Sequence, residues 1–254
     1  MTRILKYCLA VAAALMLAPI CSAETRDRAG TADKNGSMQS LPDGEVLRWR
    51  GYSAWLIDPT RRYRHGVLGD AIEAGGFAVR TPQGRVAVYR LDSSAVFEDR
   101  RVRLADLDGD GVPEAVVIKS YLQRGAAVAI YRLKGDRIRP LTEGPAIGRA
   151  NRWLNIAGIA DFDGDGRLDI AYVQTPHLAG IVRVFTLRNG SLYEIGRKAG
   201  YTNHRIGSGD LDLVRVVPGS ATGARLRIPV IGTNVMAVLG FRNGRIVELS
   251  RSPN

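Results

Sequence analysis

The sequence predicts an all-β fold built from a repeated unit, and three observations lead to this prediction. Past the first 23 residues, patterns typical of helices are almost absent, and alternating β-branched and aromatic residues are frequent. A unit with four short strands recurs at a spacing of about 50 residues. Each unit is too small to bury both faces of its own sheet, so neighbouring units must stack around an axis. The pattern predicts a β-propeller of four four-stranded blades, with an incomplete propeller or a β-sandwich as alternatives.

The clearest copies of the unit are its third and fourth strands, which read as a hairpin. Residues 127–141 (AVAIYRLKGDRIRPL) and 181–195 (IVRVFTLRNGSLYEI) alternate along two short strands around a turn that contains glycine. Residues 85–98 (RVAVYRLDSSAVFE) and 234–249 (NVMAVLGFRNGRIVEL) match the same pattern. The sequence therefore predicts four such hairpins, one in each unit.

The first two strands of a unit flank a loop, and this loop is acidic in two units. The second unit has DLDGDGVPE at residues 106–114, and the third has DFDGDGRLD at residues 161–169. The matching segment of the fourth unit has Gly219, Ala221 and Gly223 in place of the acids.

The first unit is looser than the others. Residues 54–57 lead as strand one to Asp58, and a long insertion then precedes strand two at residues 77–80. This insertion contains His65, which we expect on the same face of the molecule as the acidic loops.

The acidic loops carry the pattern of a site for a hard cation. Carboxylates at the first, third and fifth positions can point inward when the backbone curls, and glycines permit the tight turn. Six or seven oxygen ligands in a flexible cage suit Ca²⁺ better than Mg²⁺. A backbone carbonyl at position seven and a carboxylate at position nine would complete each set. The expected ligands of two Ca²⁺ sites are Asp106, Asp108, Asp110, Val112 and Glu114, and Asp161, Asp163, Asp165, Arg167 and Asp169.

Two other interpretations of these loops are weaker. An EF-hand needs a bidentate glutamate at position twelve and flanking helices, but Val117 and Tyr172 occupy that position within strand-like segments. Two solvated acidic turns without metal would leave three crowded carboxylates repelling one another in each loop.

The loops resemble the D-x-D-x-D-G-x-x-D calcium loops of FG-GAP/VCBS repeat proteins, which are integrin-type β-propellers. The resemblance covers about Ser53 to Leu249, with the motif intact twice and degenerate at Asp58 and Gly219. It implies calcium in the loops between the first and second strands of blades 2 and 3, an extracytoplasmic location, and an adhesion-like or scaffolding role. In such loops the calcium is structural, so each intact copy would fasten its own blade.

The N-terminus reads as a targeting segment. Residues 1–23 have a basic start, an apolar run and the small residues of a cleavage site after Ala23, which predicts a secretory signal peptide and a periplasmic or secreted protein. Lipidation at Cys21 is the disfavoured alternative because the bulky Ile20 precedes it. Residues 24–44 are polar and predict a disordered lead-in, and residues 45–254 form the propeller domain.

The charge favours anionic partners. The net formal charge is +11, and cleavage of the signal peptide would remove two basic residues and no acidic one, which leaves +9. No motif of a nucleic-acid-binding protein is present, and the mature chain has no apolar run of transmembrane length. Possible partners are an anionic glycan, an envelope component or another protein.

The longer connections would gather on the face opposite the acidic loops, hereafter the opposite rim. Arginine forks beside an aromatic side chain suit an anionic or sugar ligand. The alternative is structural, with the tryptophan wedged between blades and the polar side chains satisfying loop backbone. The candidate ligand-binding residues are Arg124, Asn151, Arg152, Trp153, His177, Asn203, His204 and Arg205.

Signatures of common enzymes are missing. The chain has three histidines, no H-E-x-x-H or G-x-S-x-G motif, and no cysteine after residue 23. We therefore expect a non-enzymatic binding or scaffold module without catalytic residues. The alternative is a propeller-based hydrolase or lyase that acts on envelope polysaccharide.

Overall fold

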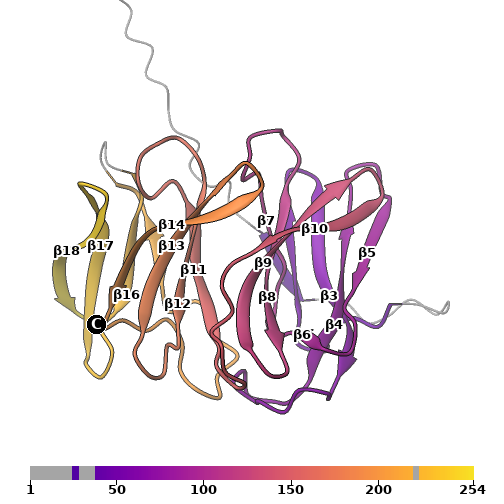
Figure 1. Ribbon diagram of the computed structural model, residues 1–254, viewed down its shortest axis with the longest axis horizontal. Helices are drawn as coiled ribbons and strands as arrows, with labels where there is room; N and C mark the ends of the chain where they lie inside the picture. Colours follow the sequence, from indigo (N-terminus) through magenta and orange to yellow (C-terminus); the bar gives the residue numbers. More distant parts are fainter. Residues whose placement is uncertain (1–24, 29–37, 220–222) are drawn as a thin grey trace, which may run out of the picture.

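The computed structural model describes residues 25–28, 38–219 and 223–254 (Figure 1). These residues form strands, turns and loops, with no helix among them. The all-β prediction is therefore confirmed for this part of the chain. Nothing in it forms a helix long and apolar enough to cross a membrane. The predicted signal peptide, with Cys8 and Cys21, lies outside the described residues.

The first group of strands is an antiparallel meander near the N-terminus. A short strand, β1 (Thr25–Arg28), pairs with its first member, and Leu41 is buried. The meander consists of β2 (Glu45–Trp49), β3 (Tyr52–Thr60), β4 (Glu73–Arg80) and β5 (Val86–Arg90).

The second meander is connected to the first. Its first strand is divided, because β6 and β7 both pair with β8, and the pairing of Ala74 with Phe97 joins β6 to β4. The two meanders therefore belong to one ten-stranded sheet. The second meander consists of β6 (Ala95–Phe97), β7 (Arg103–Ala105), β8 (Glu114–Tyr121), β9 (Gly125–Lys134) and β10 (Arg137–Glu143).

The hairpin predicted over residues 85–98 is wrong. β5 pairs with β4, and β6 pairs with β4 and β8 instead of returning along β5. This route places Phe97 edge-on against Phe77 and Tyr131, with ring centroids 5.4 and 5.9 Å apart, in the core between the two meanders. The first unit is consequently shifted by one strand, so that residues 54–57 lie in the second strand of the meander and not in the first.

The other hairpins agree with the sequence. Asn189-Gly190 and Asn243-Gly244 have positive φ at both residues, as a two-residue hairpin turn requires. The third meander consists of β11 (Leu154–Ala160), β12 (Asp169–Gln174), β13 (Ile181–Arg188) and β14 (Ser191–Ala199). The fourth consists of β15 (Arg215–Val217), β16 (Arg225–Pro229), β17 (Val235–Arg242) and β18 (Arg245–Pro253).

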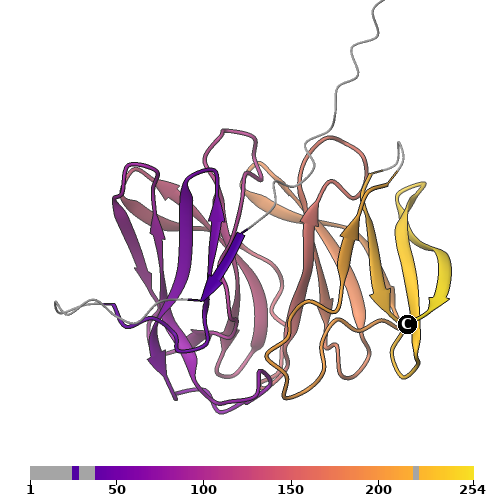
Figure 2. The ribbon, with the colours of Figure 1, turned by 180° about the vertical axis from the view of Figure 1, so that it is seen from behind.

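The core lies between successive meanders. One apolar cluster joins the first and second meanders, a second joins the second and third, and a third joins the third and fourth. Figures 1 and 2 show the N-terminal two meanders in one half of the molecule and the C-terminal two in the other. The side chain of Arg101 is 3% exposed, and its guanidinium lies 3.1 Å from Asp212 Oδ1 and 3.4 Å from Glu45 Oε2. These contacts bring β2, which contains Glu45, together with the segments that precede β7 and β15. The arrangement is propeller-like.

Candidate metal sites and the opposite rim

The first acidic loop connects β7 to β8 and is curled by its first carboxylate. Asp106 accepts hydrogen bonds from the backbone N–H groups of Gly109, at 2.9 Å, and Gly111, at 3.1 Å. Both glycines have positive φ, near 80°, which is why this turn needs glycine. The sequence thus folds the loop around its own carboxylate oxygens.

The second acidic loop, between β11 and β12, repeats this geometry. Asp161 accepts hydrogen bonds from the N–H groups of Gly164, at 2.7 Å, and Gly166, at 3.0 Å. The two loops are therefore structurally equivalent, as their matching sequences predict.

The carboxylates at the ninth position are the buried members of each loop. Glu114 is 1% exposed and accepts the N–H of Leu107 at 3.0 Å, while Asp169 is fully buried and accepts the N–H of Phe162 at 3.0 Å. Burial raises the pKa of each carboxyl to about 7, because the charged form loses its hydration. A cation beside either group would restore its usual charge at neutral pH.

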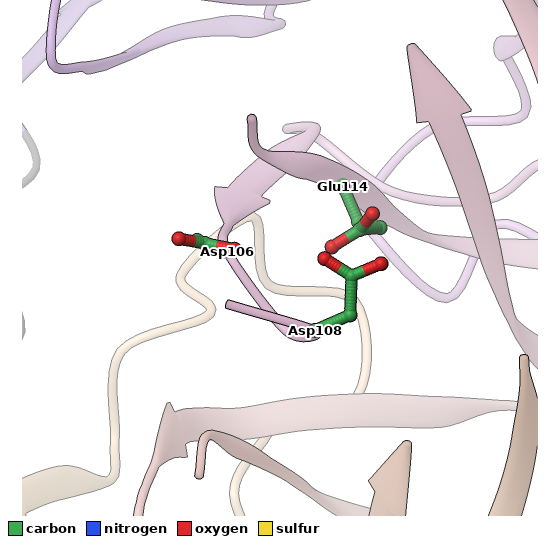
Figure 3. A group of neighbouring side chains, drawn as sticks. All are labelled: Asp106, Asp108 and Glu114. Atoms are coloured by element: carbon green, nitrogen blue, oxygen red, sulfur yellow. The ribbon is translucent and has the colours of Figure 1, made fainter. Parts of the chain in front are cut away.

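The first, third and ninth residues of each loop come together. Each of these side chains places one carboxylate oxygen within 4.8 Å of the others, and the donors are all hard oxygens that could hold a metal ion. Figure 3 shows the carboxylates of Asp108 and Glu114 facing each other across the first loop. The two groups are Asp106, Asp108 and Glu114, and Asp161, Asp163 and Asp169.

The remaining predicted ligands have other contacts. Asp110 and Asp165, at the fifth position, lie outside the two groups and accept the N–H of Val112, at 2.8 Å, and of Arg167, at 2.9 Å. The fifth carboxylate thus closes the end of each loop through the backbone of the seventh residue.

One orphaned atom supports the fit of a cation. Asp169 Oδ1 is buried and has no hydrogen-bond partner. Buried polar atoms are nearly always paired, so an unpaired carboxylate oxygen beside two further carboxylates is chemically suited to a hard cation. The degenerate loop predicted at Asp58 is wrong, because Asp58 lies within β3 and accepts a hydrogen bond from Arg90 at 2.7 Å. Gly219, in the fourth unit, has no carboxylate.

The face predicted for His65 is wrong. The insertion that contains it joins β3 to β4, the second and third strands of the first meander, and so emerges on the opposite rim. There Tyr63 accepts the N–H of Asn151 at 3.0 Å, and His65 Nδ1 lies 2.5 Å from Glu98 Oε1. The shift of the first unit by one strand explains the error.

Four of the predicted rim residues hold loops together. His177 Nε2 lies 2.9 Å from His204 Nδ1, and the buried Trp153 stacks on His177 and meets His204 edge-on. Burial and the neighbouring His204 lower the pKa of His177 to about 4. Asn203 is buried and donates to the carbonyl of Asn155 at 2.8 Å. These contacts favour the structural alternative for Trp153, Asn203 and His204.

The arginines remain available on this rim. Arg124 and Arg205 are exposed, and Arg152 is partly exposed. The guanidinium of Arg124 lies 4.0 Å from the ring centroid of Tyr121. The three side chains come from three different connections, those after β8, β10 and β14.

A group of buried ionisable side chains beside the opposite rim was not predicted from the sequence. The chain between β6 and β7 contains Glu98 and Asp99, both fully buried, and Asp99 Oδ2 lies 2.7 Å from Arg103 Nη1. Glu73, 1% exposed, has no hydrogen-bond partner on either carboxylate oxygen. The one available signal was the charged run EDRR, at residues 98–101, between two apolar segments.

The segment that contains the two acidic loops is similar to a known repeat family. Residues 106–172 match the model of the FG-GAP-like repeat, and this span contains both acidic loops. This part of the chain is therefore similar to the FG-GAP-like repeat, which confirms the resemblance over the two intact motifs.

The other two comparisons concern curated protein sequences and solved structures. No curated protein sequence matches the chain. A solved structure described as the exotype rhamnogalacturonan lyase YesX is similar, with a TM-score of 0.48 and 13% identity, over 85% of this chain and 48% of that one. The chain spans about half the length of that structure.

Proposed function

We propose that the protein is an exported calcium-binding β-propeller of four four-stranded blades that acts as a non-enzymatic binding or scaffold module. The observation that carries this proposal is the pair of equivalent acidic groups in successive meanders. Calcium would favour the ionised forms of the buried Glu114 and Asp169, and would fasten β7 to β8 and β11 to β12.

Export would suit this use of calcium. Extracellular calcium modules bind their ion in a range of roughly 10⁻⁴ to 10⁻³ M, which calcium-rich compartments sustain. The sequence of residues 1–23 is the support for a secretory signal peptide. N-terminal sequencing of the protein from its native source should find Glu24 as the first residue, and an uncleaved start would contradict export by this route.

The ligand, in this proposal, is an anionic glycan or another anionic partner, and it meets the opposite rim. Arg124, Arg152 and Arg205 present their guanidiniums there from three connections. Guanidinium forks bind carboxylate, sulfate or phosphate groups through charge and paired hydrogen bonds. Binding should therefore weaken as the salt concentration rises.

Replacement of two rim arginines tests this ligand site. The double variant Arg152→Ala, Arg205→Ala should weaken binding by about tenfold, equivalent to about 1.4 kcal/mol, without altering the calcium-dependent melting temperature. The measurement is a binding screen with acidic and neutral polysaccharides and envelope components, with calcium and with chelator.

A matched control is available on the other face. Arg137 and Arg245 are exposed and follow the β9–β10 and β17–β18 turns, on the face of the acidic loops. Alanine at both positions removes the same charge and should leave binding nearly unchanged. Equal losses in the two double variants would show a general charge effect and would contradict a site on the opposite rim.

A further inference from the structure

The two acidic loops differ at one position on the neighbouring strand. In the sheet register Glu114 of β8 pairs with Arg132 of β9, whereas Asp169 of β12 pairs with Thr186 of β13. Directly paired residues of antiparallel strands lie side by side on the same face of the sheet. Arg132 and Thr186 therefore occupy equivalent places beside the two groups of carboxylates, and only the first of them is charged.

Arg132 contacts two of the three carboxylates that could hold a cation in the first loop. Its Nη2 contacts Asp108 Oδ2, and its Nε lies 3.4 Å from Glu114 Oε1. The side chain is 39% exposed, so the guanidinium can move into solvent without a rearrangement of the core. The protein thus supplies the first group with a positive charge of its own.

Among the described residues, the second group has no such ion pair. Asp169 Oδ1 is buried without a hydrogen-bond partner. An arginine does contact the second acidic loop, because Arg188 Nη2 lies 3.3 Å from Asp165 Oδ2. Asp165, however, is outside the group of three carboxylates. Arg188 acts on Asp163 only at longer range, without an ion pair, so a cation that binds Asp161, Asp163 and Asp169 displaces no guanidinium from them.

We infer that Arg132 competes with calcium for the first acidic loop, so that the second loop binds calcium more tightly and fills at lower concentration. The inference rests on the calcium-binding function proposed above. Calcium can bind Asp108 and Glu114 only after the guanidinium has left them, and the ion pairs that are broken subtract from the affinity. Calcium at Asp163 and Asp169 breaks no equivalent contact.

Unequal calcium affinities of the two loops would stabilise the two meanders at different calcium concentrations. At low calcium only the third meander would be fastened, and the second meander would follow at higher concentration. In the absence of calcium Arg132 would hold the first loop closed, so the second meander would lose less stability on chelation than the third.

Calorimetric titration of the full-length chain with calcium, after removal of the metal, can measure each loop separately. Asp163→Ala disables the second loop and leaves the first, and Asp108→Ala does the reverse. We expect Asp108→Ala to bind one calcium at least tenfold more tightly than Asp163→Ala does. Adding Arg132→Thr to Asp163→Ala should raise the affinity of the first loop about tenfold. Arg139→Thr in the same background should change it little, because Arg139 is an exposed cross-strand neighbour of Arg132.

Two further variants separate competition from a change in folding. Arg132→Lys keeps the charge but lacks the fork, and should give a smaller gain than Arg132→Thr. Thr186→Arg, placed in the Asp108→Ala background, should weaken the second loop. Melting curves in chelator show whether each variant is folded, and the two substitutions at Arg132 provide alternatives if one is not.

The possible results distinguish the inference from the function on which it rests. Equal affinities in the two single-loop variants, or no gain on replacing Arg132, would overturn the competition while leaving calcium binding intact. Absence of calcium binding in the wild-type chain would overturn both. A gain of the same size from Arg139→Thr would show that general charge, and not the contact with Asp108 and Glu114, sets the affinity.

Discussion

Chelation of calcium is expected to lower the melting temperature of the wild-type protein by roughly 10 to 20 °C. A ligand present at 100 times its dissociation constant stabilises the folded state by about 2.7 kcal/mol per site, and the proposal has two sites. For a domain of this size each kcal/mol shifts the melting temperature by about 2 to 4 °C. The physical cause is the burial of Glu114 in the first loop and of Asp169 in the second, which raises the pKa of each carboxyl to about 7 and which a bound cation would offset.

The double variant Asp108→Ala, Asp163→Ala should abolish this shift. These two side chains belong to the carboxylate groups, but each accepts one backbone N–H, at 3.3 and 3.1 Å, whereas Asp106 and Asp161 each accept two. Their removal therefore disturbs the curl of each loop less than removal of Asp106 or Asp161 would. Differential scanning calorimetry in saturating calcium and in chelator measures the effect.

Asp136→Ala supplies the control for the loss of an acidic side chain. Asp136 is exposed in the turn between β9 and β10 and belongs to neither group. This variant should keep the full calcium shift of the wild-type chain. Identical melting of the wild-type protein in calcium and in chelator would contradict a structural role for calcium.

The parts of the fold that the sequence predicted correctly depend on local signals. Asn189-Gly190 and Asn243-Gly244 define tight turns by their backbone preference, and the spacing of Asp161, Gly164 and Gly166 defines the loop around its first carboxylate. These interactions join residues a few positions apart, so the sequence pattern contains both partners.

The parts that were missed depend on pairing between distant segments. β6 could return along β5 or join β8, and the choice depends on the burial of Phe97 against side chains from other strands. The same shift moved His65 to the other face. Arg132 and Thr186 stand at ordinary strand positions in the sequence, and only the register places them beside Glu114 and Asp169.

Glu73→Gln is expected to stabilise the protein at neutral and alkaline pH. The pairing of Ala74 with Phe97 brings Glu73 next to Glu98, and neither oxygen of the Glu73 carboxylate has a hydrogen-bond partner. Burial, followed by the negative charges of Glu98, Asp70 and Asp99, raises the pKa of Glu73 from 4.5 to about 9. The folded chain therefore holds a proton at pH 7 that the unfolded chain has released.

The sign of the pH dependence follows from this difference. The folded-state pKa is above the unfolded value, so the contribution of Glu73 is fully favourable below pH 4.5 and is lost progressively as the pH rises towards 9. Each pH unit in that window costs about 1.4 kcal/mol, so the loss at pH 7 is on the order of 3 kcal/mol. Glutamine stays neutral at every pH and should remove this loss while leaving stability at pH 4.5 little changed.

Urea unfolding at pH 5 and pH 8, in saturating calcium so that the loop carboxylates stay ionised, measures the effect. The informative comparison is Glu98→Gln, because Glu98 already has His65 at 2.5 Å and accepts a hydrogen bond from Ser120. Replacing this carboxyl with an amide should break satisfied contacts and destabilise the protein, which is the opposite sign from Glu73→Gln. If Glu73→Gln is less stable than the wild-type chain at pH 8, or keeps the same slope of stability with pH, then Glu73 is ionised in the folded protein and has a partner that compensates its charge.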